Sequence, residues 1–87
     1  MNHHHRKTLH ALFGHPLSAN ISFKDVERML LDLGATFEAR SGDRTAVSLN
    51  GHTTLFRNAH HSIPKEEVIN IRHFLTACGV EPSQYPI

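Results

Sequence analysis

Histidine and arginine are the residues of this chain whose chemistry suits a phosphate group. Nine of the 87 residues are histidine, and His60 and His61 stand together in a polar stretch just before a predicted helix. An imidazole with a pKa of about 6.5 gives and takes protons near neutral pH. A helix N-terminus nearby would help to hold an anion. The pair is a candidate for acid–base catalysis, and the alternative is a solvated loop pair or a helix-capping contact.

Three arginines, Arg40, Arg44 and Arg57, fall at the ends of predicted strands, and Lys65 lies near the start of the helix that follows. A guanidinium group binds a phosphate through two hydrogen bonds or stabilises a charged transition state. These side chains are candidates for phosphate contacts with a nucleic acid or for ion pairs with an acidic partner protein. The alternative is ordinary solvated surface charge.

The remaining histidines and the single cysteine give no metal site. His60 and His61 with His73 have no recognised ligand spacing, and the run His3–His5 reads as a tag remnant or a mobile tail. Cys78 lies on an apolar helix stripe and is expected in the core. A lone cysteine excludes an intramolecular disulfide and argues against a cysteine-based zinc site, and it fits a reducing cytoplasm. We expect no metal and no cofactor.

Hydrophobic spacing and turn residues define the elements that must position these side chains. Ser22 is a favourable N-cap, and Pro64 suits the first position of a helix. The dipeptide Asn50-Gly51 predicts a type I′ hairpin, which places Val47 opposite Thr54. The predicted helices cover residues 5–13, 22–33 and 64–78, and the predicted strands cover residues 35–40, 44–49 and 52–57.

The tight hairpin also decides which side chains share a face of the sheet. Val47, Leu49 and Phe56 share one face, which is the better candidate for the core. Arg44 and Arg57 share the other, more open face.

The order α-α-β-β-β-α predicts a single α+β domain over residues 1–87. Residues 1–20 form an extension with a short helix, 21–80 form the core, and 81–87 form an extended tail. Helices are expected on one face of a three-stranded antiparallel sheet. This is the layout of the double-stranded-RNA-binding fold.

Composition excludes several classes of protein. The formal charge of +1 excludes a polybasic mode of nucleic-acid binding but allows a local basic patch. No apolar stretch approaches the roughly 18 residues that span a bilayer, and no secretory signal is visible. We expect a cytoplasmic protein without a membrane partner.

The segment from Ile21 to Val80 combines several motifs in a defined order. They are a helix ending in Leu-x-x-x-Gly, a strand ending in Arg40, a turn with Gly42, a β-hairpin, a loop with His60 and a final helix capped by glycine. In this order and spacing the segment resembles the HicA toxin family of bacterial toxin–antitoxin pairs. The resemblance implies a small metal-independent endoribonuclease that acts on mRNA, does not act on DNA by itself, and is neutralised by a HicB-like antitoxin.

The chain departs from the family at its catalytic turn. The family reads Gly-Ser-His, whereas the matched residues here are Gly42, Asp43 and Arg44. An arginine cannot give up its proton near neutral pH. The family's Gly-Ser-His turn could instead be aligned with Gly51 and His52. We reject this alignment, because it leaves only one strand before the last helix.

His60 matches the family's loop histidine and is the candidate for proton transfer, and the guanidinium of Arg44 is the candidate for stabilising the transition state. The candidates for RNA contacts, from their charge and position, are Arg40, Arg57, His61 and Lys65. Two alternatives stay open: a catalytically inactive HicA-like module that binds RNA or protein, and a small α+β interaction protein.

Overall fold

The chain folds into three α-helices and one three-stranded antiparallel sheet within the residues that the structure describes. The computed structural model covers residues 1–87 and describes residues 1–16, 20–40, 42–57 and 62–87. The sheet order is β1-β2-β3, so each strand pairs with its neighbour in the chain. The α+β class and the order of the main elements are as predicted. The elements are α1 (His3–Leu12), α2 (Phe23–Asp32), β1 (Thr36–Ala39), β2 (Arg44–Leu49), β3 (His52–Arg57), α3 (Lys65–Ala77) and the 3₁₀ turn η1 (Pro82–Gln84).

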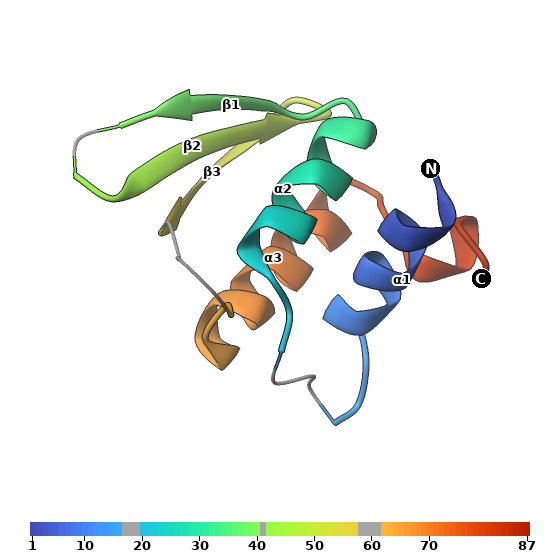
Figure 1. The fold of residues 1–87 in the computed structure, drawn as a ribbon. Helices are drawn as coiled ribbons and strands as arrows, with labels where there is room; N and C mark the ends of the chain where they lie inside the picture. Colours follow the sequence, from blue (N-terminus) through green and yellow to red (C-terminus); the bar gives the residue numbers. More distant parts are fainter. Residues whose placement is uncertain (17–19, 41, 58–61) are drawn as a thin grey trace.

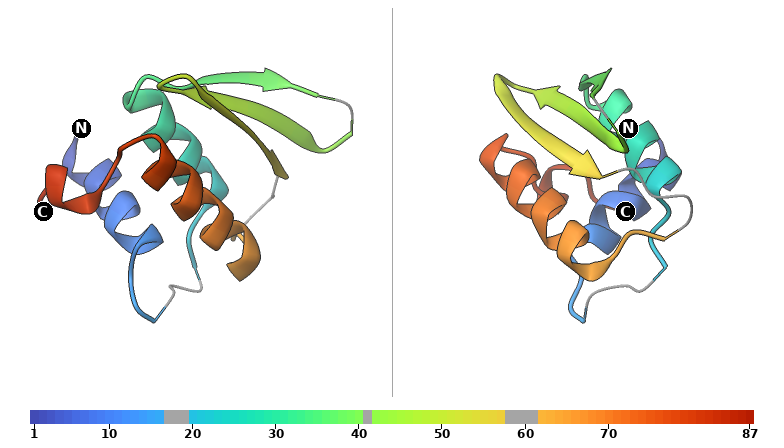
Figure 2. Two further views of the ribbon diagram at one scale, coloured as in Figure 1. Left: turned by 180° about the vertical axis from the view of Figure 1, so that it is seen from behind. Right: turned by 90° about the vertical axis from the view of Figure 1, so that its left-hand side faces the viewer.

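The helices lie on one side of the sheet, as Figures 1 and 2 show from opposite directions. Helix α3 packs against β3, and α1 packs against both α2 and α3 on the side away from the sheet. The other face of the sheet carries no covering element from the described chain. A one-sided antiparallel sheet of this kind leaves its second face exposed to solvent.

Helix α2 follows its local signals. The Ser22 hydroxyl accepts a long hydrogen bond from the Asp25 backbone N–H (3.5 Å), and Gly34 adopts a φ of +99° just after the helix. The helical residues are Phe23–Asp32, so the predicted range 22–33 includes both caps. Its apolar stripe is buried in the core, as the 3.6-residue spacing requires.

Helix α1 begins earlier than the sequence predicts. Asn2 is the N-cap, and its side-chain oxygen accepts a hydrogen bond from the His5 backbone N–H at 2.8 Å. The run His3–His5 forms the first turn, so the expectation of a mobile tail is wrong. His4 Nε2 lies 3.2 Å from Asp25 Oδ1, and His5 Nδ1 lies 2.7 Å from Asp32 Oδ2. These two contacts join α1 to α2 and order the terminus.

The hydrogen bond from His5 lowers the pKa of Asp32 below its ordinary value of 3.8, and the positive N-terminus acts in the same direction. A depressed pKa in the folded state stabilises the fold above the unfolded value and loses that effect as pH falls. We therefore expect Asp32→Asn to lower the free energy of unfolding at pH 6. The difference in free energy between the variant and the wild type should shrink as the pH falls through and below 3.8. Urea unfolding across this range measures it. Asp43→Asn, an exposed turn residue, is the control, and an equal deficit at both ends of the range would contradict the prediction.

The β2–β3 hairpin has the predicted register. Asn50 and Gly51 have φ values of +51° and +82°, as a type I′ turn requires. Leu49 lies opposite His52, and Thr45 lies opposite Phe56. Both strands have the predicted bounds, whereas β1 covers Thr36–Ala39 and is shorter than the predicted range 35–40.

One hydrophobic core joins the sheet to the helices. The three residues predicted for the inner face, Val47, Leu49 and Phe56, are at most 4% exposed. Phe56 meets Phe74 of α3 edge to face, with ring centroids 5.7 Å apart. On the opposite face Leu55 is 52% exposed. The prediction of one buried and one open face is therefore confirmed.

The last helix and the tail differ from expectation in detail. Pro64 is the N-cap of α3 and precedes the first helical residue. The sequence predicts an extended tail, but Pro82 begins a 3₁₀ turn in which Glu81 and Gln84 cap each other. His10 Nε2 lies 2.9 Å from the Tyr85 carbonyl oxygen, so the tail packs on α1. The fixed φ of proline favours such a turn, and the contact with α1 holds it.

Candidate nucleic-acid interface

Three arginines form a row across one end of the sheet. The Arg40 backbone N–H donates to the Arg44 carbonyl oxygen at 3.0 Å, which continues the β1–β2 register by one residue. Arg44 lies directly opposite Arg57 in the β2–β3 register. Residues opposite each other in an antiparallel sheet point to the same face. The structure thus brings together the three predicted arginines, which we call the arginine row.

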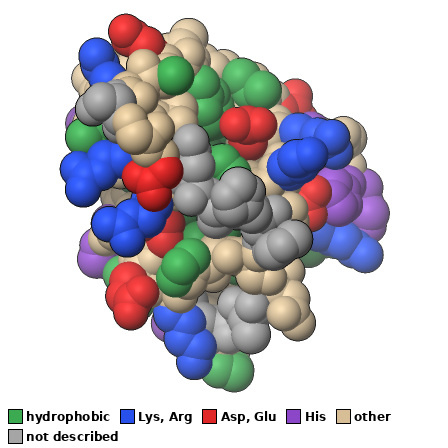
Figure 3. All heavy atoms as spheres, turned by 60° about the vertical axis from the view of Figure 1, so that its left-hand side comes forward, with side chains coloured by type: hydrophobic (Ala, Val, Ile, Leu, Met, Phe, Trp, Pro, Cys, Tyr) green, Lys and Arg blue, Asp and Glu red, His purple; other side chains and the backbone are tan. Residues whose placement is uncertain are grey.

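The arginine row lies on the open face of the sheet, and all three residues are exposed. Arg40 has an ion-pair contact with Glu38, with Nη1 and Oε1 3.7 Å apart. Figure 3 shows that Lys and Arg side chains on this side of the molecule lie beside acidic ones and form no continuous basic surface. The local charge therefore suits a few phosphate contacts at defined positions.

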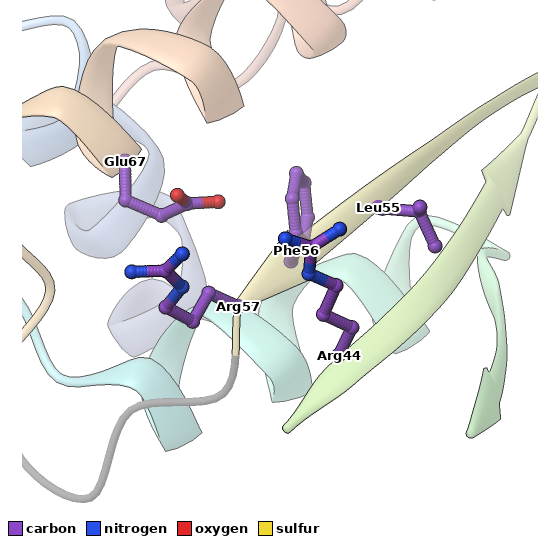
Figure 4. Close-up of a pocket in the computed structure, with 5 residues that line it drawn as sticks. All are labelled: Arg44, Leu55, Phe56, Arg57 and Glu67. Atoms are coloured by element: carbon purple, nitrogen blue, oxygen red, sulfur yellow. The ribbon is translucent and has the colours of Figure 1, made fainter. Parts of the chain in front are cut away.

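A hollow of about 180 Å³ lies beside two members of the row. Arg44, Leu55, Phe56 and Arg57 of the hairpin line it, together with Glu67 from the first turn of α3. Figure 4 shows Arg57 extending from the end of β3 toward Glu67, while Arg44 extends from β2 toward β3. Two cationic groups and one carboxylate thus reach the same hollow from three elements.

Glu67 is the residue of this hollow that sequence reasoning missed. Its Oε1 atom is buried and has no hydrogen-bond partner among the described residues. The sequence shows Glu67 only as one of two acidic residues in a first helical turn, where the helix dipole favours them. Its spacing of four residues from the buried Ile71 was the available signal, because residues four apart share a helix face.

The other predicted site residues are not among the described residues that line the hollow. Lys65 is the first residue of α3 and is exposed, but it does not line the hollow. His60 and His61 lie outside the described residues. In sequence, His60 follows Arg57 by three positions.

Cys78 is a core residue, as predicted. Its side chain is buried, and its Sγ donates to the Leu49 carbonyl oxygen at 3.3 Å. Burial raises the pKa of the thiol, which keeps it protonated and unreactive at neutral pH. Asn50 Nδ2 donates to the Cys78 carbonyl oxygen at 2.9 Å. Cys78 therefore also anchors the hairpin turn to the end of α3.

We expect this thiol to resist alkylation by iodoacetamide at pH 7.5 in the native protein and to react fully in denaturant. The reason is that reagent and thiolate can meet only when the core opens. Mass spectrometry of samples taken over time measures the modified fraction. Rapid, complete modification without denaturant would show that Cys78 is accessible.

The described residues contain neither a metal-binding cluster nor a membrane-spanning helix. No group of three or more His, Cys, Asp or Glu side chains there is arranged to hold a metal ion. No helix in the same part of the chain has the length and apolar character to cross a bilayer.

Comparison with known proteins gives no relative for this chain. No protein-family model matches it, and neither the curated proteins nor the solved structures contain a match.

Proposed function

We propose that the chain is a HicA-like, RNA-directed toxin of a bacterial toxin–antitoxin pair, acting on mRNA in the cytoplasm and neutralised by a HicB-like protein. The observation that carries the proposal is the arginine row on the open sheet face. Residues 21–80 also follow the order α-β-β-β-α with helices on one side of the sheet, which is the layout of the double-stranded-RNA-binding fold. The motif residues that carry the HicA resemblance occur in the matching order along these elements.

The proposed reaction is cleavage of the RNA backbone without a metal ion. A base removes the proton of a 2′-hydroxyl, the 2′ oxygen bonds to phosphorus, and the bond to the 5′ oxygen breaks as an acid protonates that oxygen. His60 is the candidate for a proton-transfer step, because Arg44 occupies the position of the family's catalytic histidine. Arg44 and Arg57 would hold the phosphate and stabilise its developing charge.

A second candidate is a HicA-like module that binds RNA without cleaving it. Arg44 favours this reading because its guanidinium cannot take part in proton transfer. The arginine row would then serve recognition alone, and the sheet face would bind RNA or an acidic segment of a partner protein.

Incubation of the purified protein with a long RNA tests the proposal and separates the candidates. The toxin predicts RNA fragments that disappear when a HicB-like antitoxin is added. Intact RNA with salt-sensitive binding would support the module. Absence of both cleavage and binding would overturn both and leave a protein-interaction domain.

A further inference from the structure

Two energetically unfavourable features meet in the hollow beside β3. Arg44 and Arg57 lie directly opposite each other, and like charges in that arrangement destabilise a strand pair. The buried Oε1 of Glu67 has no hydrogen-bond partner in the described part of the chain. A buried acceptor without a partner is energetically unfavourable, and more so when it is charged. A ligand that satisfies both features at once would explain why they occur together.

The groups lining the hollow define the chemistry of that ligand. The two guanidinium groups only donate hydrogen bonds and require an anionic acceptor. The Glu67 carboxylate only accepts and requires a donor. Arg57 does not satisfy the buried Oε1 of Glu67, because that atom has no hydrogen-bond partner among the described residues. The ligand must therefore carry a donor directly beside an anion.

A ribonucleotide has this pairing, because its 2′-hydroxyl stands next to its 3′-phosphate. A DNA backbone would meet the arginines but would leave Glu67 unsatisfied, because its phosphodiester and deoxyribose carry no hydroxyl donor. The 2′-hydroxyl is also the group by which proteins distinguish RNA from DNA.

We propose that Glu67 accepts a hydrogen bond from a ribose 2′-hydroxyl while Arg44 and Arg57 hold the adjacent phosphate, so that the hollow selects RNA over DNA. This inference rests on the proposed function, since it requires that the chain binds RNA. The view in Figure 4 fits it, with the Glu67 carboxylate and the Arg57 guanidinium turned toward each other across the hollow. Leu55 supplies an exposed apolar wall on the sheet face beside them.

The test compares two oligonucleotides that differ in the donor alone. Fluorescence anisotropy measures binding of an RNA 12-mer and of its 2′-fluoro analogue, which keeps an RNA-like sugar but lacks the hydroxyl proton. Readings are taken before cleavage products appear on a gel. The wild-type protein is expected to prefer RNA by about tenfold, the value of one charge-assisted hydrogen bond. Glu67→Ala should remove this preference.

Glu66→Ala is the matched control, because Glu66 is exposed in the same helical turn and does not line the hollow. It should keep the preference for RNA. If Glu67→Ala alters the affinity for both oligonucleotides equally, Glu67 is only a counter-charge for Arg57 and the inference is wrong. A wild-type protein that binds both equally well contradicts the inference alone, whereas one that binds neither overturns the proposed function as well. Thermal unfolding of each variant checks that it is folded.

Discussion

Replacing Arg44 and Arg57 together with alanine is expected to reduce RNA affinity by about 10²- to 10⁴-fold. Each guanidinium contributes hydrogen bonds to a charged phosphate, worth about 1.5–3 kcal/mol per contact. Removing two phosphate contacts should also lower the slope of log affinity against log salt by about 1.4 for single-stranded RNA. Filter binding at several salt concentrations measures both quantities.

The matched control is the double variant Lys24→Ala/Arg28→Ala, which removes the same charge from exposed positions of α2. It should change affinity only slightly if binding depends on the row at the end of the sheet. The arginine double variant should remain folded, because both side chains are exposed and like charges no longer face each other. Equal loss of affinity in the two double variants would show that net charge alone attracts RNA.

Local signals explain the parts of the fold that could be predicted from the sequence. The Asn50-Gly51 turn defines the pairing of β2 and β3, because a two-residue hairpin leaves no freedom of register. That register alone placed Arg44 opposite Arg57 and put Val47 on the buried face. The apolar stripe and the Ser22 cap likewise defined α2.

Contacts between distant segments explain the parts that could not be predicted. The run His3–His5 is helical because Asn2 caps it. The imidazoles of His4 and His5 also contact Asp25 and Asp32 of α2. The tail turns back onto α1, where Arg6 Nη1 donates to the Pro86 carbonyl oxygen at 3.1 Å. Neither contact has a signature within a short window of sequence.

The candidate site likewise has one part that local sequence signals predict and one part that depends on contacts between distant segments. The two hairpin arginines could be predicted to share a face, because one turn relates them. The approach of Glu67 depends on how α3 packs across the sheet, which Phe56 and Phe74 help to determine. The site is therefore a hairpin feature completed by a helix that joins it only in the folded chain.

Replacing His60 with alanine is expected to abolish growth inhibition if this histidine has taken over proton transfer. Loss of a general acid or base typically costs about 10²–10⁴ in rate, which is enough to remove toxicity at moderate expression. Arg44 cannot compensate, because its guanidinium stays protonated. Growth curves after induction, with the antitoxin absent, measure the effect.

His52→Ala and His73→Ala are the controls for this experiment, because both residues are exposed and neither lines the hollow. Both variants should remain toxic.

The decisive combination is a folded His60→Ala protein that still binds RNA with the wild-type salt dependence but no longer cuts it, since this separates chemistry from recognition. Full toxicity in a folded His60→Ala protein would remove His60 from the mechanism, and His61→Ala would then be the next variant to assay. If wild-type protein binds RNA and none of these variants differs from it in a cleavage assay, the arginine row serves recognition alone and the chain is the non-catalytic module.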